Sequence, residues 1–223
     1  MTFSSFVIKI KDLIYIYFFS QLKVRVGEWD ASGFNAPEQQ EHKEYTVVRI
    51  TKHPQFSAKR LNNNIALLTV NQDIDLSQSN VNTACLPSCD NQFDFRFNNG
   101  TGTRCWVAGW GKDQVNGQFQ FIQRKVDLPL FEFNRCSQAL KDAMNKRTPG
   151  LGNRFTLHNS EVCAGGELGK DACTGDGGSP LVCQAQSGRY TVVGLVTWGV
   201  GCASDIPGVY AKISYFRDWI NQN

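Results

Sequence analysis

From Leu22 onward, apolar residues occur in short runs that are separated by turn-forming residues. The runs either alternate with polar positions or are continuously apolar, as is typical of half-buried and fully buried strands. Glycine and proline lie between the runs and mark turns. The pattern predicts strands at residues 24–26, 46–50, 65–70, 106–108, 125–128, 181–183, 190–198 and 209–211.

Helical patterns are few. Residues 132–145 form one candidate helix, and residues 215–221 form a second one near the C-terminus. In the second, Phe216, Trp219 and Ile220 recur at the i, i+3 and i+4 spacing of a helix face. Many short strands with so little helix predict an all-β fold, either a sandwich or barrels, with a C-terminal helix.

The first twenty residues differ in composition from the rest. They are rich in Phe, Ile and Tyr, but Lys9, Lys11 and Asp12 interrupt them. The uninterrupted apolar stretch, residues 13–19, is too short to cross a bilayer, so we expect no membrane span. Two interpretations stay open: an atypical signal peptide, or an alternative or mispredicted beginning that replaced a genuine upstream segment. We therefore treat residues 1–21 as a separate, non-homologous segment.

Composition narrows the function classes. The net charge is +3, and the Lys and Arg residues do not form a run along the chain. We therefore expect no nucleic-acid partner. The eight cysteines are too scattered for a zinc knuckle and too many for a typical cytosolic enzyme. They indicate disulfides and a secreted, extracellular protein. The sequon at Asn99, in a polar loop, agrees with this location.

Motifs in order along the chain resemble one family, the trypsin- and chymotrypsin-like (S1 family) serine protease domain. They are Val26-Gly27-Glu28, His53-Pro54, Asn64 to Leu68, Ala84 to Pro87, Trp106 to Gly111, Gly175 to Pro180, Trp198-Gly199, Gly201-Cys202 and Pro207 to Tyr210. The resemblance implies two packed antiparallel β-barrels, with the domain at residues 22–223. The first barrel (22–100) would be incomplete, because its opening strands are not found, and the second (104–223) complete. Within the family, the chain resembles the non-catalytic serine protease homologs of arthropods, which often carry a clip domain.

Three departures from the family pattern concern catalysis. Gly177 stands where the family has the nucleophilic serine, in Gly-Asp-Gly-Gly-Ser-Pro instead of Gly-Asp-Ser-Gly-Gly-Pro. Asn64 stands at the position of the acid that orients the base, and the segment that carries the base histidine is absent. The remaining histidines, His42, His53 and His158, lie in other contexts. The resemblance therefore implies a pseudoprotease without peptidase activity.

Other residues of the sequence match the remaining parts of the family's active site. Gly175 and Asp176 match the oxyanion loop. Asp171 matches a carboxylate at the floor of a trypsin-like specificity pocket, whose walls would be Thr197, Trp198, Gly199 and Gly208. Such a pocket favours an Arg or Lys side chain. The alternative for Asp171 is a solvated loop residue without this role.

One stretch resembles the family's calcium loop. Its oxygen donors are Glu28, Asp30, Glu38 and Glu41, a set that suits a structural Ca²⁺ ion. The other interpretation, which we favour, is an acidic surface loop, and we expect no other metal or cofactor.

Disulfide pairing follows only from the resemblance, since eight cysteines allow 105 connectivities. The family pairs Cys105 with Cys183, Cys136 with Cys163, and Cys173 with Cys202. Cys85 matches a cysteine that tethers an upstream segment, and Cys89 is additional. These two can bond each other, stay free or bond another chain.

Three hypotheses for function remain. The first, which we favour, is an inactive homolog, similar to prophenoloxidase-activating factors, that acts as a binding cofactor or regulator of extracellular protease cascades in innate immunity and melanisation. Its partners would be proteins of such a cascade. The second is an active trypsin-like endopeptidase whose sequence comes from a faulty gene model. The third is a truncated product without function.

Overall fold

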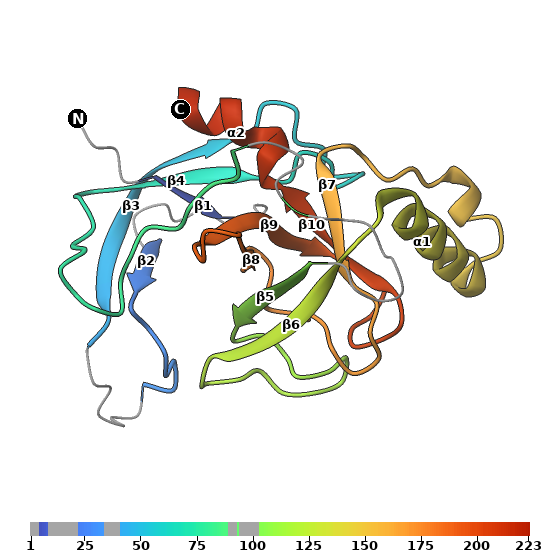
Figure 1. Cartoon of the computed structure of the whole chain (residues 1–223), viewed down its shortest axis with the longest axis horizontal. Coiled ribbons are helices and arrows are strands. Elements are labelled where there is room, and N and C mark those ends of the chain that lie inside the picture. The colour runs from blue at the N-terminus through green and yellow to red at the C-terminus, as the bar shows by residue number, and fades with distance from the viewer. Residues whose placement is uncertain (1–4, 9–21, 34–40, 89–92, 94–102) are drawn as a thin grey trace.

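The chain folds into an open sheet that lies beside a closed barrel (Figure 1). The structure is a computed structural model that describes residues 5–8, 22–33, 41–88, 93 and 103–223. The strands are β1 (Ser5–Ile8), β2 (Lys23–Val26), β3 (Lys43–Lys52), β4 (Ala66–Val70), β5 (Arg104–Gly109), β6 (Arg124–Phe131), β7 (Glu161–Gly165), β8 (Pro180–Gln184), β9 (Tyr190–Trp198) and β10 (Pro207–Lys212). The helices are α1 (Phe133–Arg147), the 3₁₀ turn η3 (Gly152–Arg154) and α2 (Ile213–Gln222).

The barrel consists of six antiparallel strands in the order β10-β7-β6-β5-β8-β9. Apolar side chains alternate inward along β5, where Cys105 and Val107 are buried while Arg104 and Trp106 face outward. Closure removes the free edges that an open sheet would expose. The loops at one end of this barrel form the site described below.

The first lobe is a four-stranded antiparallel sheet in the order β1-β4-β3-β2. Its core is built on Tyr45, Val47, Leu68 and Val70. The strand β1 pairs with β4 from Ser5 opposite Thr69 to Ile8 opposite Ala66. Four residues of the segment that we separated from the domain thus extend this sheet and cover the edge of β4.

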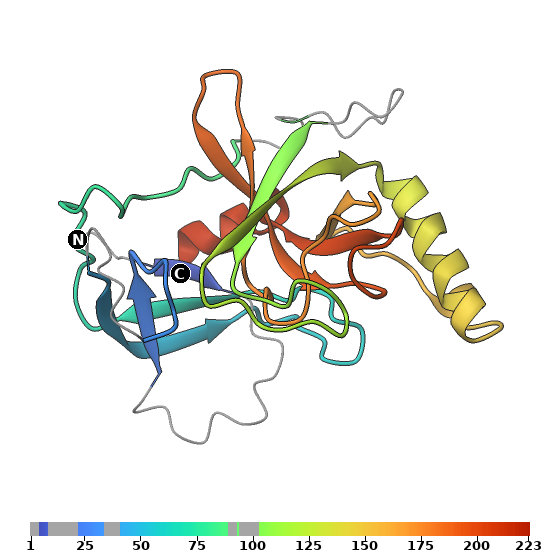
Figure 2. The same ribbon diagram turned by 90° about the horizontal axis from the view of Figure 1, so that it is seen from below.

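A third apolar cluster joins the two lobes. Ile65, at the start of β4, packs with Leu195 of β9 and with Phe216 of α2. The helix α2 therefore lies over the junction, whereas α1 projects from the end of the barrel that faces away from the sheet (Figures 1 and 2). No helix among the described residues is long and apolar enough to cross a membrane.

The predicted fold class is confirmed: the chain is mostly strand, with a closed barrel, a second sheet and a C-terminal helix. Seven of the eight predicted strands lie within observed ones, the eighth, residues 65–70, begins one residue before β4, and both helices form. Two strands were missed. The strand β7 is buried at all five positions and short, so it carries no alternation to detect. The strand β1 lies in the segment that we had set apart.

Candidate functional site

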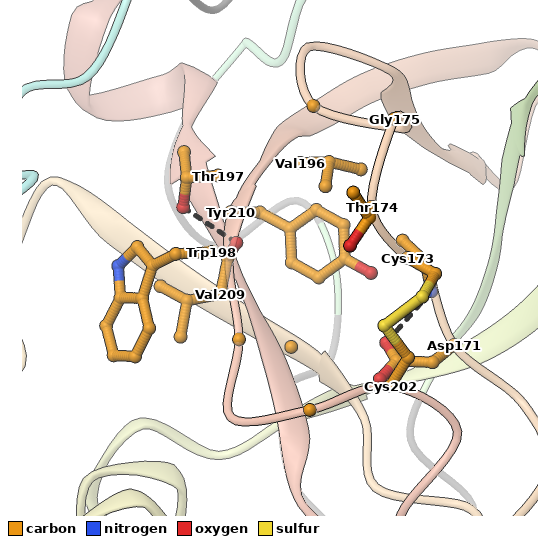
Figure 3. A pocket seen from close by; sticks show the side chains of 15 residues that line it. Asp171, Cys173, Thr174, Gly175, Val196, Thr197, Trp198, Cys202, Val209 and Tyr210 are labelled. Carbon is orange, nitrogen blue, oxygen red and sulfur yellow. Dashed lines mark hydrogen bonds between the residues drawn. A yellow bond between two sulfur atoms is a disulfide. The ribbon is translucent and has the colours of Figure 1, made fainter. Parts of the chain in front are cut away.

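A cavity of about 340 Å³ opens at one end of the barrel, between the loop that precedes β8 and the end of β9 (Figure 3). The five residues that the sequence assigned to a specificity pocket line this cavity together: Asp171, Thr197, Trp198, Gly199 and Gly208. Gly175 and Gly177 line it as well. The loop that carries them is tied to the opposite wall by the Cys173–Cys202 disulfide.

Asp171 lies in this cavity as a largely buried carboxylate. Its two oxygens accept hydrogen bonds from backbone N–H groups, Oδ1 from Ala172 at 2.9 Å and Oδ2 from Ala203 at 3.1 Å. Burial, with a smaller contribution from the charge of Asp176, raises the pKa of Asp171 to about 6. No Lys, Arg or His of the described residues forms an ion pair with it. The site therefore holds a negative charge at neutral pH that a cationic ligand can neutralise.

Space beside this carboxylate depends on Gly208. A Cβ atom at Gly208 would lie 3.2 Å from Asp171 Oδ1.

Tyr210 was missed as a site residue, although its motif was noticed in the sequence. It is 1% exposed, lines the cavity, and its hydroxyl lacks a hydrogen-bond partner in the described structure. Burial and the nearby charges of Asp171 and Asp176 raise the pKa of Tyr210, so the hydroxyl stays protonated.

The wall residue Trp198 is held by a second residue that sequence reasoning missed, Glu161. The indole Nε1 donates to Glu161 Oε1 at 2.9 Å, and the other carboxylate oxygen accepts from the His158 N–H at 2.9 Å. Glu161 is 3% exposed, and burial raises its pKa. Phe155 meets the Trp198 ring edge to face at 5.6 Å. Opposite Trp198, Thr197 donates from Oγ1 to Val209 O at 2.7 Å.

The carboxylate of Asp176 points away from the cavity. It accepts hydrogen bonds from the N–H groups of Gly111 at 2.8 Å and Cys173 at 3.0 Å. A Cβ atom at Gly109 or Gly111 would lie 2.1 Å or 2.5 Å from its atoms. The two glycines of the Gly-Trp-Gly motif thus leave the room in which Asp176 lies.

Gly177 and the nearby Ser179 occupy different places. Gly177 lines the cavity and contributes no side chain. Ser179 donates its N–H to Asp176 O at 2.9 Å and directly precedes Pro180, the first residue of β8. Its hydroxyl lies beneath the loop, 2.9 Å from the Cβ position of Gly109.

No histidine lines the cavity. His53 packs against Phe216 and Trp219 of α2, with ring centroids 5.2 and 5.0 Å apart. His158 Nδ1 is bonded to Ser160 Oγ at 2.8 Å, and His42 pairs with Glu28. None of these three imidazoles is therefore placed to take a proton at Gly177.

Asn64 is 2% exposed and lies two residues before β4, outside the cavity lining. Its side-chain Nδ2 has no hydrogen-bond partner in the described structure. The neighbouring Asn63 has positive φ, 51°, and donates its N–H to Ser160 Oγ at 3.2 Å. A neutral amide at Asn64 supplies no charge to an imidazolium.

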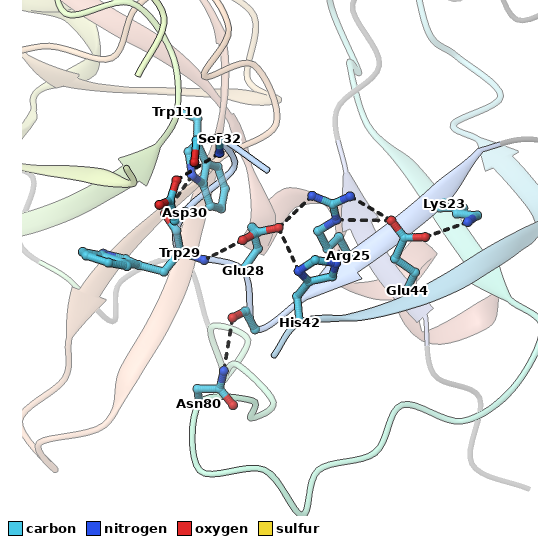
Figure 4. A network of polar contacts seen from close by, with 11 residues as sticks. Lys23, Arg25, Glu28, Trp29, Asp30, Ser32, His42, Glu44, Asn80 and Trp110 are labelled. Atoms are coloured by element: carbon cyan, nitrogen blue, oxygen red, sulfur yellow. Dashed lines mark hydrogen bonds and ion pairs between the residues drawn. The ribbon is translucent and has the colours of Figure 1, made fainter. Parts of the chain in front are cut away.

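The calcium-loop candidates do not meet at one point in the described residues. Glu28 Oε2 accepts from Arg25 at 2.7 Å and pairs with His42 at 3.2 Å (Figure 4). Asp30 accepts instead from the Ser32 N–H. Glu41 joins no group of three or more His, Cys, Asp or Glu residues, and Glu38 lies outside the described residues. Arg25 already holds Glu28, and the described residues contain no group of three or more His, Cys, Asp or Glu side chains that could hold a metal ion, so a Ca²⁺ ion at this loop stays a prediction.

Three disulfides lie in the described part of the chain, with the pairs that the resemblance implied. They are Cys105–Cys183, Cys136–Cys163 and Cys173–Cys202. Cys85 is half buried and forms no disulfide in the described structure, and its carbonyl accepts from the Val192 N–H at 2.9 Å. Cys89 lies outside the described residues, so the pairing of this cysteine stays open.

Comparison with protein families gives one match. The model of the family described as trypsin matches residues 19–220. The match begins three residues before the boundary that we expected at residue 22.

Individual relatives include proteins named as inactive proteases and a protein named trypsin. The chain is 48% identical over 203 residues to "Inactive CLIP domain-containing serine protease A3" of Aedes aegypti, covering 89% of this chain and 39% of that protein. It is 40% identical over 205 residues to "Phenoloxidase-activating factor 2" of Galleria mellonella, covering 90% and 63%. It is also 35% identical over 206 residues to "Trypsin" of Phaedon cochleariae, covering 90% and 67%. The chain thus spans between about two fifths and two thirds of the length of these relatives.

Proposed function

Because the chain belongs to the trypsin family, we propose that it is a serine protease homolog that binds a basic side chain of another protein and does not cut it. The observation that carries the proposal is the cavity in which a buried, unpaired Asp171 and a glycine at position 177 meet. The carboxylate supplies affinity for a cation, and the glycine supplies no nucleophile.

The pocket residues divide this work. Asp171 would form a charge-assisted pair with a guanidinium or ammonium group, which is stronger in a partly dehydrated site than in water. Gly208 leaves the space for that group, and the free hydroxyl of Tyr210 offers it one further hydrogen-bond acceptor. Trp198, fixed by Glu161, forms an apolar wall against the stem of the side chain.

Inactivity rests on three features, the missing nucleophile, the missing acid and the placement of the histidines. Nucleophilic attack needs a hydroxyl activated by a base that is itself oriented by an acid. Gly177 has no hydroxyl, Asn64 has no charge, and the three histidines have other partners. Two relatives support the same conclusion, because the Aedes protein and an Anopheles gambiae protein at 36% identity carry "inactive" in their names.

We place this binding activity outside the cell, in a protease cascade. The disulfides support an oxidising compartment. The Galleria relative is named as an activator of phenoloxidase, which supports a regulatory role in innate immunity and melanisation. The chain would then act by holding a cascade protein through an exposed Arg or Lys.

The test is a titration of the protein with benzamidine, a planar amidinium that imitates an arginine side chain. We expect saturable binding at pH 7.5. Since the Asp171 carboxyl is neutral below a pKa of about 6, the affinity should fall about tenfold by pH 5. Asp171→Asn should remove the binding and its pH dependence. Asp205→Asn, which removes an equal charge at an exposed position near the pocket, is the control. Unchanged binding in Asp171→Asn would refute the proposed pocket.

A further inference from the structure

Three large aromatic side chains are exposed where the first lobe meets the barrel. Trp29 is 54% exposed, Phe119 is 56% exposed and Phe121 is 63% exposed. We call these three residues the seam surface. Grouped exposed aromatic side chains are costly in water and are characteristic of sites that bind other proteins.

Backbone hydrogen bonds hold the two segments of the seam surface side by side. Ala31 N–H donates to Phe121 O at 2.9 Å, and Gln123 N–H donates to Trp29 O at 2.9 Å. Asp30 and Ile122 form an antiparallel bridge between these two bonds. The indole of Trp110 adds a bond to the same Trp29 carbonyl at 3.2 Å. The seam surface therefore has a fixed backbone and is not a pair of unrelated loops.

The register of this bridge places Trp29 and Phe121 on one face. In an antiparallel pair, residues opposite each other share a face, and so do residues two apart on one strand. Trp29 lies diagonally across from Phe121, while Asp30 and Ile122 face the other way and are less exposed. Figure 4 shows the Trp29 ring directed away from Glu28 and its ion pairs.

The seam surface reaches the rim of the pocket. A Cβ atom at Gly175 would lie 2.7 Å from Phe119 Cε1, so the ring rests against this glycine. Gly175 itself lines the cavity that contains Asp171. The centroid of the Phe119 ring lies 5.4 Å from Lys112 Nζ. An extended chain that leaves the pocket passes Phe119 within a few residues, since each residue spans about 3.3–3.6 Å.

We propose that the seam surface binds apolar side chains of the same partner segment whose basic side chain enters the pocket. The inference rests on the proposed function of the pocket and adds to it the kind of segment that is recognised: an exposed Arg or Lys with large apolar residues a few positions away. Asp171 selects the cation, and Phe119 and Phe121 bury the apolar neighbours. Specificity for one partner then comes from the combination, because an isolated basic residue occurs on most protein surfaces.

The experiment compares two fluorescent peptides of nine residues with a central Arg, flanked on both sides by Leu and Phe in one and by Ser in the other. We expect the apolar peptide to bind the unmodified chain about tenfold more tightly or better. Phe119→Ser and Phe121→Ser should each reduce this preference and leave the affinity for the Ser peptide unchanged. Leu76→Ser, which changes an exposed leucine outside the seam surface, is the control and should keep the full preference.

The outcomes separate the inference from the proposal on which it rests. If Asp171→Asn weakens the binding of both peptides but the unmodified chain binds both peptides equally well, the proposed pocket is supported and the proposed role of the seam surface is overturned. If the apolar peptide binds equally well with Asp171→Asn, the seam surface acts without the pocket, and the claim of one shared segment is overturned. If neither peptide binds, the proposed function and this inference both fail.

Discussion

At the scale of single residues, the function that we propose depends on a few exchanges within a family pattern. The glycine at 177 has no positive φ, unlike its neighbours Gly175 and Gly178. A serine would therefore adopt the backbone conformation at 177 without strain. The sequence identified this exchange, and the pocket residues around it, because they lie in motifs. It could not identify Glu161 or the free hydroxyl of Tyr210 as parts of the site, since those roles follow from burial and distance.

Gly177→Ser alone is predicted to leave the protein without peptidase activity. The new hydroxyl would have no base, because none of the three histidines lines the cavity, and a serine without a base is a poor nucleophile at neutral pH. Hydrolysis of arginyl and lysyl fluorogenic peptides measures this. Turnover above the unmodified chain would mean that another residue acts as the base.

At the scale of elements, the hydrophobic pattern was sufficient for both helices and for eight strands, including β9, which is buried at most positions, but it was insufficient for the short strand β7. The helix α1 was predicted at residues 132–145 and runs from Phe133 to Arg147, with Cys136 and Leu140 on its buried face. The strand β7 is buried on both faces and was missed. In α1 the residue before the first turn, Glu132, accepts from the N–H groups of Asn134 and Arg135 at 2.9 and 2.8 Å.

Glu132→Ala is predicted to destabilise the protein by about 1 kcal/mol, because two N–H groups at the start of α1 lose their acceptor. For a domain of this size we expect the melting temperature to fall by about 2–4 °C. Glu132→Asp keeps a carboxylate at the cap and should therefore lose less stability than Glu132→Ala. Equal melting temperatures for the unmodified chain and Glu132→Ala would show that the cap contributes nothing to stability.

At the scale of the whole molecule, the two lobes differ in how their edges are protected. The barrel closes on itself and carries the three disulfides of the described residues. In the first lobe, β2 pairs with β3 alone among the strands that the structure describes, and it alternates between exposed and half-buried positions. The sequence predicted that this lobe would be incomplete. It could not predict that Ser5–Ile8 would pair with β4, because strand partners distant along the chain are not encoded in a local pattern.

Hydrogen exchange should therefore be uneven. We expect strong protection at residues 106–108 and 190–198 in the barrel, and weaker protection at residues 24–26 and 46–50 in the first lobe. Amide exchange followed by mass spectrometry measures both lobes in one sample. Equal protection would mean that the N-terminal segment stabilises the first lobe as fully as closure stabilises the barrel.

The measurement that tests the central claim most directly is native mass spectrometry of the protein after long incubation with a peptide that contains one arginine between apolar residues. Binding without cleavage predicts a one-to-one complex in which the peptide keeps its full mass, and loss of that complex in Asp171→Asn. Peptide fragments that end at the arginine would contradict the account, because they would show a working protease. The absence of any complex at neutral pH would contradict it equally, because the pocket around Asp171 would then have no ligand of this kind.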